Sequence, residues 1–170
     1  MSYSVPDLSA YLSGVWTVER TLVDRATGAR GTFSGTVTFG PPETAGDDGA
    51  LLQRESGRLR WGQHEAKATR EYVWRPTASP DTMDVFFPDG RFFHTVRLGA
   101  VRPGAGDGGD QGPRWQAEHW CAPDDYRVAY TVLGPDELQY EWDVRGPRKD
   151  QLLTTRLRRD VGRVGGHPSR

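Results

Sequence analysis

The chain has 170 residues, and its 22 Lys and Arg side chains are balanced by 23 Asp and Glu, for a formal net charge of −1. Because the basic residues are scattered among acidic ones, the sequence lacks the positive patch of a nucleic-acid-binding protein, and we predict no nucleic-acid partner. Cys121 is the single cysteine, which excludes an internal disulfide, and the chain shows neither a signal peptide nor an apolar run of about 20 residues that would span a membrane. These features predict a cytoplasmic protein without a membrane partner.

The first predicted elements are a short helix and two strands. The helix covers residues 7–12, begins after Pro6 and stops at Gly14. Strands are predicted over residues 15–24 and 32–39, and in the second one apolar residues alternate with Ser and Thr, which is typical of a half-buried strand. Gly35 lies on the apolar face of that strand and predicts a bend or a close approach of another backbone.

Further strands follow at short, even spacing. They are predicted over residues 50–61, 64–75, 83–87, 91–98, 114–121, 126–133, 138–144 and 151–159. Turns rich in Gly, Pro and Asp separate them, and residues 99–113 predict a mobile surface loop. About ten strands in such a series predict an all-β antiparallel meander, closed into a barrel with the helix plugging one end. We expect one barrel domain over residues 1–160 and a disordered tail over residues 161–170.

Gly14-Val15-Trp16, at the start of the first strand, resembles the corresponding point of lipocalin-type barrels. In those barrels the indole plugs one end, and an arginine of the last strand lies over its ring. The resemblance implies that Arg156 or Arg158 covers Trp16.

Several longer motifs resemble a bacterial family catalogued as domain of unknown function 6314. The most specific are Asp-Gly-Arg-Phe-Phe-His at residues 89–94 and Arg-Gly-Pro-Arg-Lys-Asp at residues 145–150, and the likeness runs over about residues 8–159. The resemblance implies a compact barrel and carries over no established activity.

His119 and Cys121 are a candidate metal site. They lie two residues apart on a predicted strand, so their side chains share a face. If His94 or His64 faces them across the barrel, the three would bind zinc or copper. The alternative is that Cys121 is a small buried hydrophobe and His119 makes one core hydrogen bond.

Asp125 and Tyr126 are candidates for proton transfer. A carboxylate and a phenol at a barrel mouth, together with His94 or His119, would act as general base and hydrogen-bond donor. The alternative is that the Asp residues after Pro123 serve the turn itself, because aspartate binds its own backbone two residues on.

Charged and aromatic strand residues are candidates for a ligand site. Arg54, Glu55, Arg70 and Glu71 would form a matched polar network inside the barrel, or else cross-strand ion pairs on its outside. Arg148, in the turn at residues 145–150, would grip a carboxylate or phosphate group. The aromatic candidates for the pocket wall are Tyr72, Trp74 and Trp142, which would otherwise be core residues.

The leading functional hypothesis is a lipocalin-like barrel that holds an aromatic or amphipathic small molecule in an internal pocket. The alternative is a pocket enzyme, an isomerase, cyclase or hydratase of a secondary metabolite, that uses the His, Asp and Tyr candidates. A second alternative is haem or metal binding through a histidine. A barrel filled solid by its aromatic residues would instead be an interaction protein, and we expect a monomer or a homodimer.

Overall fold

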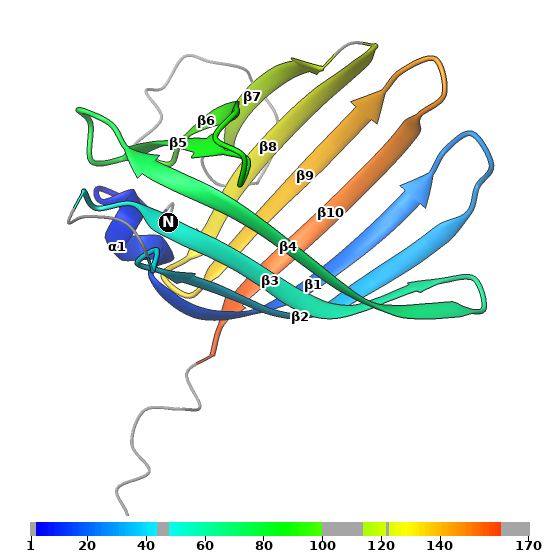
Figure 1. The fold of residues 1–170 in the computed structure, drawn as a ribbon, viewed down its shortest axis with the longest axis horizontal. Coiled ribbons are helices and arrows are strands. Elements are labelled where there is room, and N and C mark those ends of the chain that lie inside the picture. The colour runs from blue at the N-terminus through cyan, green and yellow to red at the C-terminus, as the bar shows by residue number, and fades with distance from the viewer. Residues whose placement is uncertain (1–2, 44–47, 100–113, 122, 161–170) are drawn as a thin grey trace, which may run out of the picture.

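The computed structural model describes residues 3–43, 48–99, 114–121 and 123–160, and it confirms the predicted all-β barrel with a short N-terminal helix (Figure 1). The elements are α1 (Leu8–Leu12), β1 (Gly14–Asp24), β2 (Arg30–Gly40), β3 (Leu51–Trp61), β4 (His64–Pro76), β5 (Thr82–Phe86), β6 (Phe92–Arg97), β7 (Arg114–Cys121), β8 (Asp124–Gly134), β9 (Glu137–Arg145) and β10 (Asp150–Arg159). The loop predicted at residues 99–113 and the predicted tail lie outside the described residues, apart from Gly99. No helix in the described ranges is long and apolar enough to cross a membrane.

All ten strands form one antiparallel sheet in the order β6-β5-β4-β3-β2-β1-β10-β9-β8-β7. Apart from β6 and β7, strands that follow each other in the chain pair with each other, and the pairing of β1 with β10 joins the first and last strands. β6 and β7 lie close together, but no strand ladder joins them within the described ranges. The barrel is therefore nearly closed, with a seam between β6 and β7.

Trp16 and α1 close one end of the barrel. Asp7 caps the helix by accepting a hydrogen bond from the Ala10 amide at 2.9 Å, and Leu8 and Leu12 turn into the core. The indole of Trp16 is fully buried and donates to the Leu12 carbonyl at 2.7 Å. The helix is too short to be stable alone, so this packing is what holds it in place.

Arg159 covers Trp16, and the prediction of Arg156 or Arg158 for this role is wrong. The Arg159 guanidinium lies 4.1 Å from the centre of the indole ring and donates to the Tyr11 carbonyl at 2.6 Å. Trp16 and Arg159 are opposite each other in the β1–β10 register, which places the two side chains on the same face. Arg156 and Arg158 instead pair with Glu137 on the outside.

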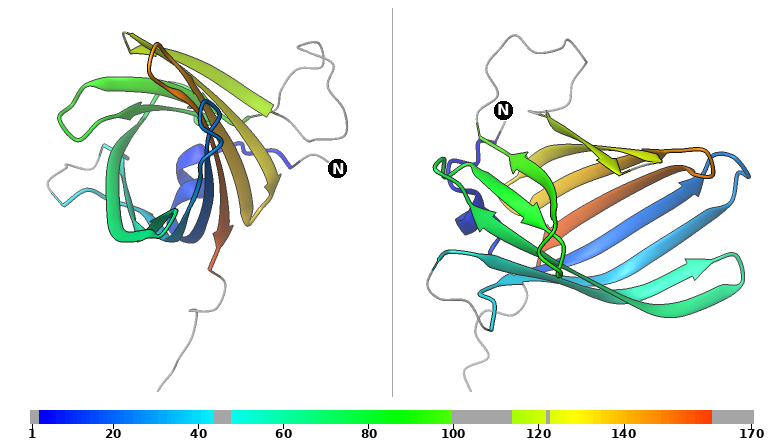
Figure 2. Two further views of the ribbon diagram at one scale, coloured as in Figure 1. Left: turned by 90° about the vertical axis from the view of Figure 1, so that its right-hand side faces the viewer. Right: turned by 45° about the horizontal axis from the view of Figure 1, so that its top comes forward.

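The other end of the barrel is open to solvent. Leu22, Leu59, Ala68 and Trp142 pack against the core yet remain partly exposed, in contrast to the fully buried residues beside the helix. Viewed from this end, the helix lies at the far side of the strand ring (Figure 2). Solvent therefore reaches the interior from the hairpin ends opposite α1.

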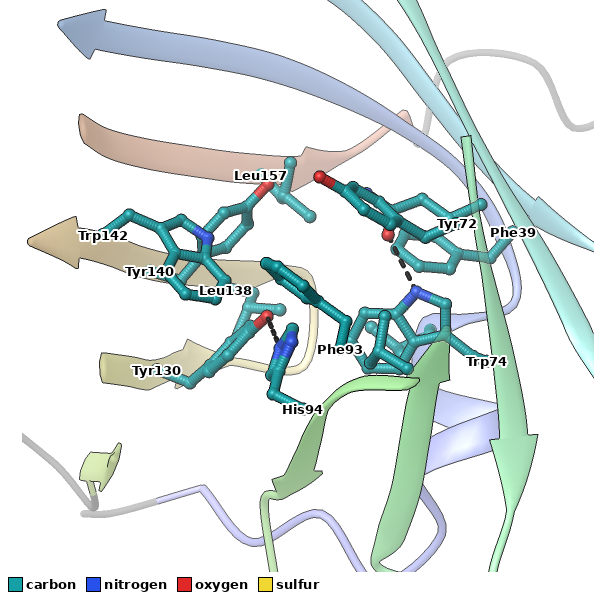
Figure 3. A pocket seen from close by; sticks show the side chains of 13 residues that line it. Phe39, Tyr72, Trp74, Phe93, His94, Tyr130, Leu138, Tyr140, Trp142 and Leu157 are labelled. Atoms are coloured by element: carbon teal, nitrogen blue, oxygen red, sulfur yellow. Dashed lines mark hydrogen bonds between the residues drawn. The ribbon is translucent and has the colours of Figure 1, made fainter. Parts of the chain in front are cut away.

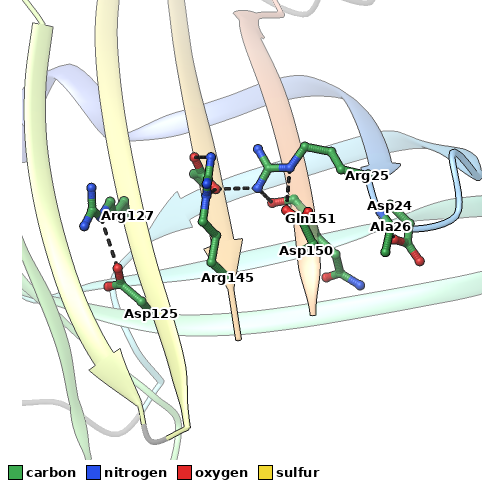
Figure 4. A network of polar contacts seen from close by, with 9 residues as sticks. Asp24, Arg25, Ala26, Asp125, Arg127, Arg145, Asp150 and Gln151 are labelled. Carbon is green, nitrogen blue, oxygen red and sulfur yellow. Dashed lines mark hydrogen bonds and ion pairs between the residues drawn. The ribbon is translucent and has the colours of Figure 1, made fainter. Parts of the chain in front are cut away.

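Ion pairs tie the outer rim of this open end together (Figure 4). Arg25 follows directly after β1. Its Nη2 lies 2.6 Å from Asp143 Oδ1 on β9, and its Nε lies 2.6 Å from Asp150 Oδ1 on β10. The backbone amide of Arg25 also donates to the Asp150 carbonyl at 2.7 Å. The β1–β2 turn is thus held against the β9–β10 turn, which keeps the rim in one arrangement.

Gly35 confirms the predicted close approach. It lies opposite Gly57 in the β2–β3 ladder, and a Cβ at Gly35 would collide with the Ser56 carbonyl and with Gly57. Backbone atoms cannot yield as the end of a flexible side chain can, so only glycine fits.

We expect Gly35→Ala to lower the free energy of unfolding by about 1–3 kcal/mol, the usual cost of overpacking. Gly40→Ala is the matched control, because it lies on the same strand and a Cβ there meets nothing within 4 Å. Urea denaturation of both variants measures the difference, and equal losses would contradict the close approach as the reason for glycine.

Candidate functional site

The barrel encloses a cavity of about 20 Å³ between the helix and the open end (Figure 3). It is lined by Leu12, Phe39, Gln53, Tyr72, Trp74, Val85, Phe93, His94, Tyr130, Leu138, Tyr140, Trp142 and Leu157. The wall is mainly aromatic and aliphatic, with a few phenol, imidazole and amide groups. A lining of this kind occurs both in protein cores and in small-molecule sites, and a cavity of this volume has room for about one water molecule.

A bulge in the β5–β6 hairpin turns both Phe93 and His94 toward the cavity. Val85 pairs with His94 and Phe86 pairs with Phe92, so Phe93 is the extra residue at a register shift. Neighbouring residues on a regular strand point to opposite faces, and a bulge is the usual way to break that rule. Simple alternation along residues 91–98 therefore could not have placed both side chains inside.

Phe93 is the centre of an aromatic cluster, defined here as Tyr72, Phe87, Phe93, His94, His119 and Trp142. Its ring centre lies 4.5 Å from that of Phe87, 5.1 Å from Trp142 and 5.2 Å from His119. Figure 3 shows the Phe93 ring in the middle of the labelled side chains. Phe93 thus lies in the barrel lumen and forms part of the cavity wall. A ligand larger than a water molecule would have to displace its ring.

His94 is buried and uncharged at neutral pH. Its Nε2 lies 3.3 Å from the Tyr130 hydroxyl, and its Nδ1 has no hydrogen-bond partner. Burial, together with the charge of His119, lowers the pKa of the His94 ring to about 3. Burial also raises the pKa of the Tyr130 hydroxyl well above its ordinary value. Both groups are therefore neutral hydrogen-bonding groups.

A buried ion pair crosses the interior from β1 to β3. Arg20 and Glu55 are 6% and 3% exposed, and the guanidinium meets the carboxylate in two hydrogen bonds of 2.7 and 2.8 Å. Arg20 also donates to Thr155 at 2.7 Å and contacts the Tyr140 hydroxyl at 3.2 Å. Sequence reasoning missed Arg20, although the period of two from Trp16 through Val18 would have placed it on the inner face.

Of the four charged candidates on β3 and β4, the structure places one pair inside and the other outside. Glu55 and Arg70 are opposite each other and face inward, with Arg70 Nη2 lying 3.4 Å from Glu55 Oε1. Arg54 and Glu71 pair at 2.8 Å with side chains 52% and 41% exposed. The two alternatives left open by the sequence, a polar network inside the barrel and ion pairs on its outside, therefore each describe one of the pairs.

The remaining candidates lie in several places. Trp74 is buried in the cavity wall and donates to Gln53 at 2.8 Å. Tyr126 lies at the open end, with its ring centre 6.5 Å from His119 and 6.3 Å from Trp142. Asp125, which precedes Tyr126, lies on the outer face, where its Oδ2 is 3.1 Å from Arg127 Nε (Figure 4).

In the turn at residues 145–150, Arg148 is exposed and Lys149 makes the contacts toward the barrel. Lys149 lies 3.1 Å from Asp124 and 3.2 Å from the Tyr126 hydroxyl. For the proposed metal site, the side chain of Cys121 lies outside what the structure describes. Within the described part of the chain, no three His, Cys, Asp or Glu side chains lie close enough together to hold a metal ion.

A nearly closed antiparallel barrel, plugged by a short helix and a tryptophan under an arginine, defines the lipocalin-like class of folds. The family described as "Family of unknown function (DUF6314)" matches residues 12–159, and the chain belongs to it. No curated protein matches the sequence.

Several solved structures are similar to this one at low sequence identity. The S-type phycobiliprotein lyase CPES from Guillardia theta is 9% identical with a TM-score of 0.60, and the match covers 94% of each chain. A redesigned β-barrel, mFAP1, bound to DFHBI is 15% identical with a TM-score of 0.43, covering 89% of this chain and 97% of that one. A DUF3598-family protein from Nostoc punctiforme is 12% identical with a TM-score of 0.44, covering 92% of this chain and 51% of that one. At 9% identity the likeness to the lyase concerns the fold alone.

Proposed function

We propose that this protein binds a small aromatic or amphipathic molecule in the barrel lumen, through the end opposite α1. The observation that carries the proposal is a pair of unsatisfied polar atoms. Within the described part of the chain, two buried side-chain atoms lack a hydrogen-bond partner, Arg70 Nε and His94 Nδ1, and both belong to inward-facing side chains. A buried polar atom without a partner is costly in a folded protein, so two in one lumen support the binding of a molecule that supplies the missing partners.

The size of the cavity determines how such a molecule would bind. Because about 20 Å³ accommodates only about one water, a ligand has to displace part of the aromatic cluster. Tyr72 and Trp142 are partly exposed, so their rings can move toward the open end without leaving a void in the core. We therefore expect binding to be coupled to ring movement, with the displaced rings stacking on the ligand.

The test uses phenylnaphthylamine, a neutral aromatic probe whose emission rises in apolar surroundings. We expect one probe to bind per protein. Ala68→Trp, which places an indole at the open end of the lumen, should weaken binding by about tenfold or more. Thr69→Trp is the matched control, since Thr69 is one residue along on the same strand and exposed on the outside.

If Ala68→Trp does not fold, Leu59→Trp serves as a second blocking variant, because Leu59 is also inward-facing and partly buried. Circular dichroism checks the fold of each variant. Absence of saturable binding, or equal weakening by the inner and outer Trp variants, would show that the lumen is not a binding site. The enzyme and haem alternatives stay predictions, and no observation on the described residues favours either.

A further inference from the structure

The charges inside the barrel do not cancel. Arg20 and Glu55 are the buried charged residues in the described part of the chain, and they satisfy each other through two hydrogen bonds. Arg70 faces the same carboxylate but makes only a 3.4 Å contact with it. Two guanidinium groups against one carboxylate leave one net positive charge, and it resides mainly on Arg70.

Arg70 is also the member of this group that a ligand can reach. Its side chain is 35% exposed, against 6% for Arg20, and its Nε has no partner. Its guanidinium lies 5.3 Å from the ring centre of Tyr72, which lines the cavity. The fork of an arginine with free N–H groups matches an oxyanion with two oxygens, such as a carboxylate.

The surroundings of Arg70 favour an anion over a second cation or a neutral molecule. All three guanidinium nitrogens of Arg20 already donate hydrogen bonds: Nε to Thr155, Nη1 to Glu55, and Nη2 to both Glu55 and the Tyr140 hydroxyl. Burial raises the pKa of the Tyr72 hydroxyl, partly opposed by the charge of Arg70, so this phenol remains a hydrogen-bond donor. At the open end, Lys149 and Asp124 neutralise each other at 3.1 Å.

We propose that the lumen selects molecules that carry one oxyanion group, such as a carboxylate or sulfonate, on an aromatic or amphipathic body, and that Arg70 is the residue that binds this group. The inference rests on the proposed function and narrows it to a class of ligand. The whole chain has a net charge of −1, so its overall field does not by itself attract anions. A preference for the anion would therefore report on the local charge at Arg70.

The experiment compares two probes of nearly the same shape, neutral phenylnaphthylamine and anionic anilinonaphthalene sulfonate, on the full chain. We expect the sulfonate to bind about tenfold more tightly or better, the size expected of one charge-assisted hydrogen bond. Arg70→Gln should remove this preference while leaving the affinity for the neutral probe within about twofold. Arg70→Lys, which keeps the charge without the fork, should retain part of the preference.

Arg54→Gln is the matched control, because it removes an arginine from the neighbouring strand β3 on the outer face and should leave the preference unchanged. If the neutral probe binds but the sulfonate binds no tighter, or if Arg70→Gln leaves the ratio of affinities unchanged, the anionic class is wrong and the proposed function stands. If neither probe binds, the proposed function itself fails.

Discussion

We expect Glu55→Gln to lower the free energy of unfolding by about 3–5 kcal/mol, because it leaves the Arg20 guanidinium buried without its counter-charge. The variant is nearly isosteric, so the loss reports on the charge rather than on packing. Glu55 is 3% exposed, so solvent does not reach the site to hydrate the Arg20 charge once the carboxylate is lost. Urea or guanidinium denaturation measures the change.

Glu71→Gln provides the control for this result. Glu71 pairs with Arg54 on the outer face of the same two strands, where both side chains are about half exposed. Exposed pairs of this kind contribute about 0–1 kcal/mol. If the two variants lost the same amount of stability, the buried pair would not hold the strands together as the structure indicates.

The same pair predicts a dependence of stability on pH. Burial alone would raise the pKa of the Glu55 carboxyl, but the hydrogen bond from Arg20 and the charges of Arg70 and Arg20 outweigh it and lower the pKa. A carboxyl whose pKa is lower in the folded state contributes stability that is present above the unfolded pKa, about 4.3, and is lost as the pH falls through the folded pKa. The stability difference between wild type and Glu55→Gln should therefore shrink below about pH 4. A difference that stays constant down to acid pH would contradict this assignment.

We expect Trp16→Ala to cost about 3–5 kcal/mol, the usual loss for removing a large aromatic side chain from a core. The indole is fully buried between α1 and Arg159, so its removal leaves a cavity and also takes away the donor to the Leu12 carbonyl. The short helix depends on this contact, and we expect it to detach as well.

Trp142→Ala is the comparison for this variant, because Trp142 also faces inward but lies partly exposed at the open end. We expect it to lose clearly less stability, and circular dichroism with thermal melting ranks the two. A larger loss at Trp142 would mean that the cluster at the open end, rather than the plug at α1, supports the barrel.

The architecture could be predicted from the sequence because its strands carry the information locally. Residues 32–39 alternate apolar and hydroxyl side chains, and the structure places Phe33, Val37 and Phe39 in the core as that alternation requires. Turns such as Pro88-Asp89-Gly90 mark the strand ends, and Gly90 does adopt a positive φ of 89°. Pattern and turn chemistry agree along the chain, which is when such a prediction succeeds.

The interior chemistry was harder to predict, because it depends on register and on irregularities. Arg54 and Glu55 are both charged, so alternation separates them but cannot say which one faces inward. The bulge that brings Phe93 beside His94 has no sequence signal short of the pairing itself. Arg159 covers Trp16 only because of the β1–β10 register, which joins residues far apart in the chain.

The order of strands in the sheet has a consequence for how the chain folds. Strands β1 to β6 and strands β7 to β10 are two runs of hairpins between neighbours, and each run can form from local contacts. The β1–β10 ladder alone connects the two runs by strand pairing within the described ranges, and it brings the first and last strands of the barrel together. Pairing Trp16 with Arg159 closes most of the chain into a loop, so the entropy lost in this step is smaller once the two runs have formed, and both halves of the barrel depend on it for their shared core.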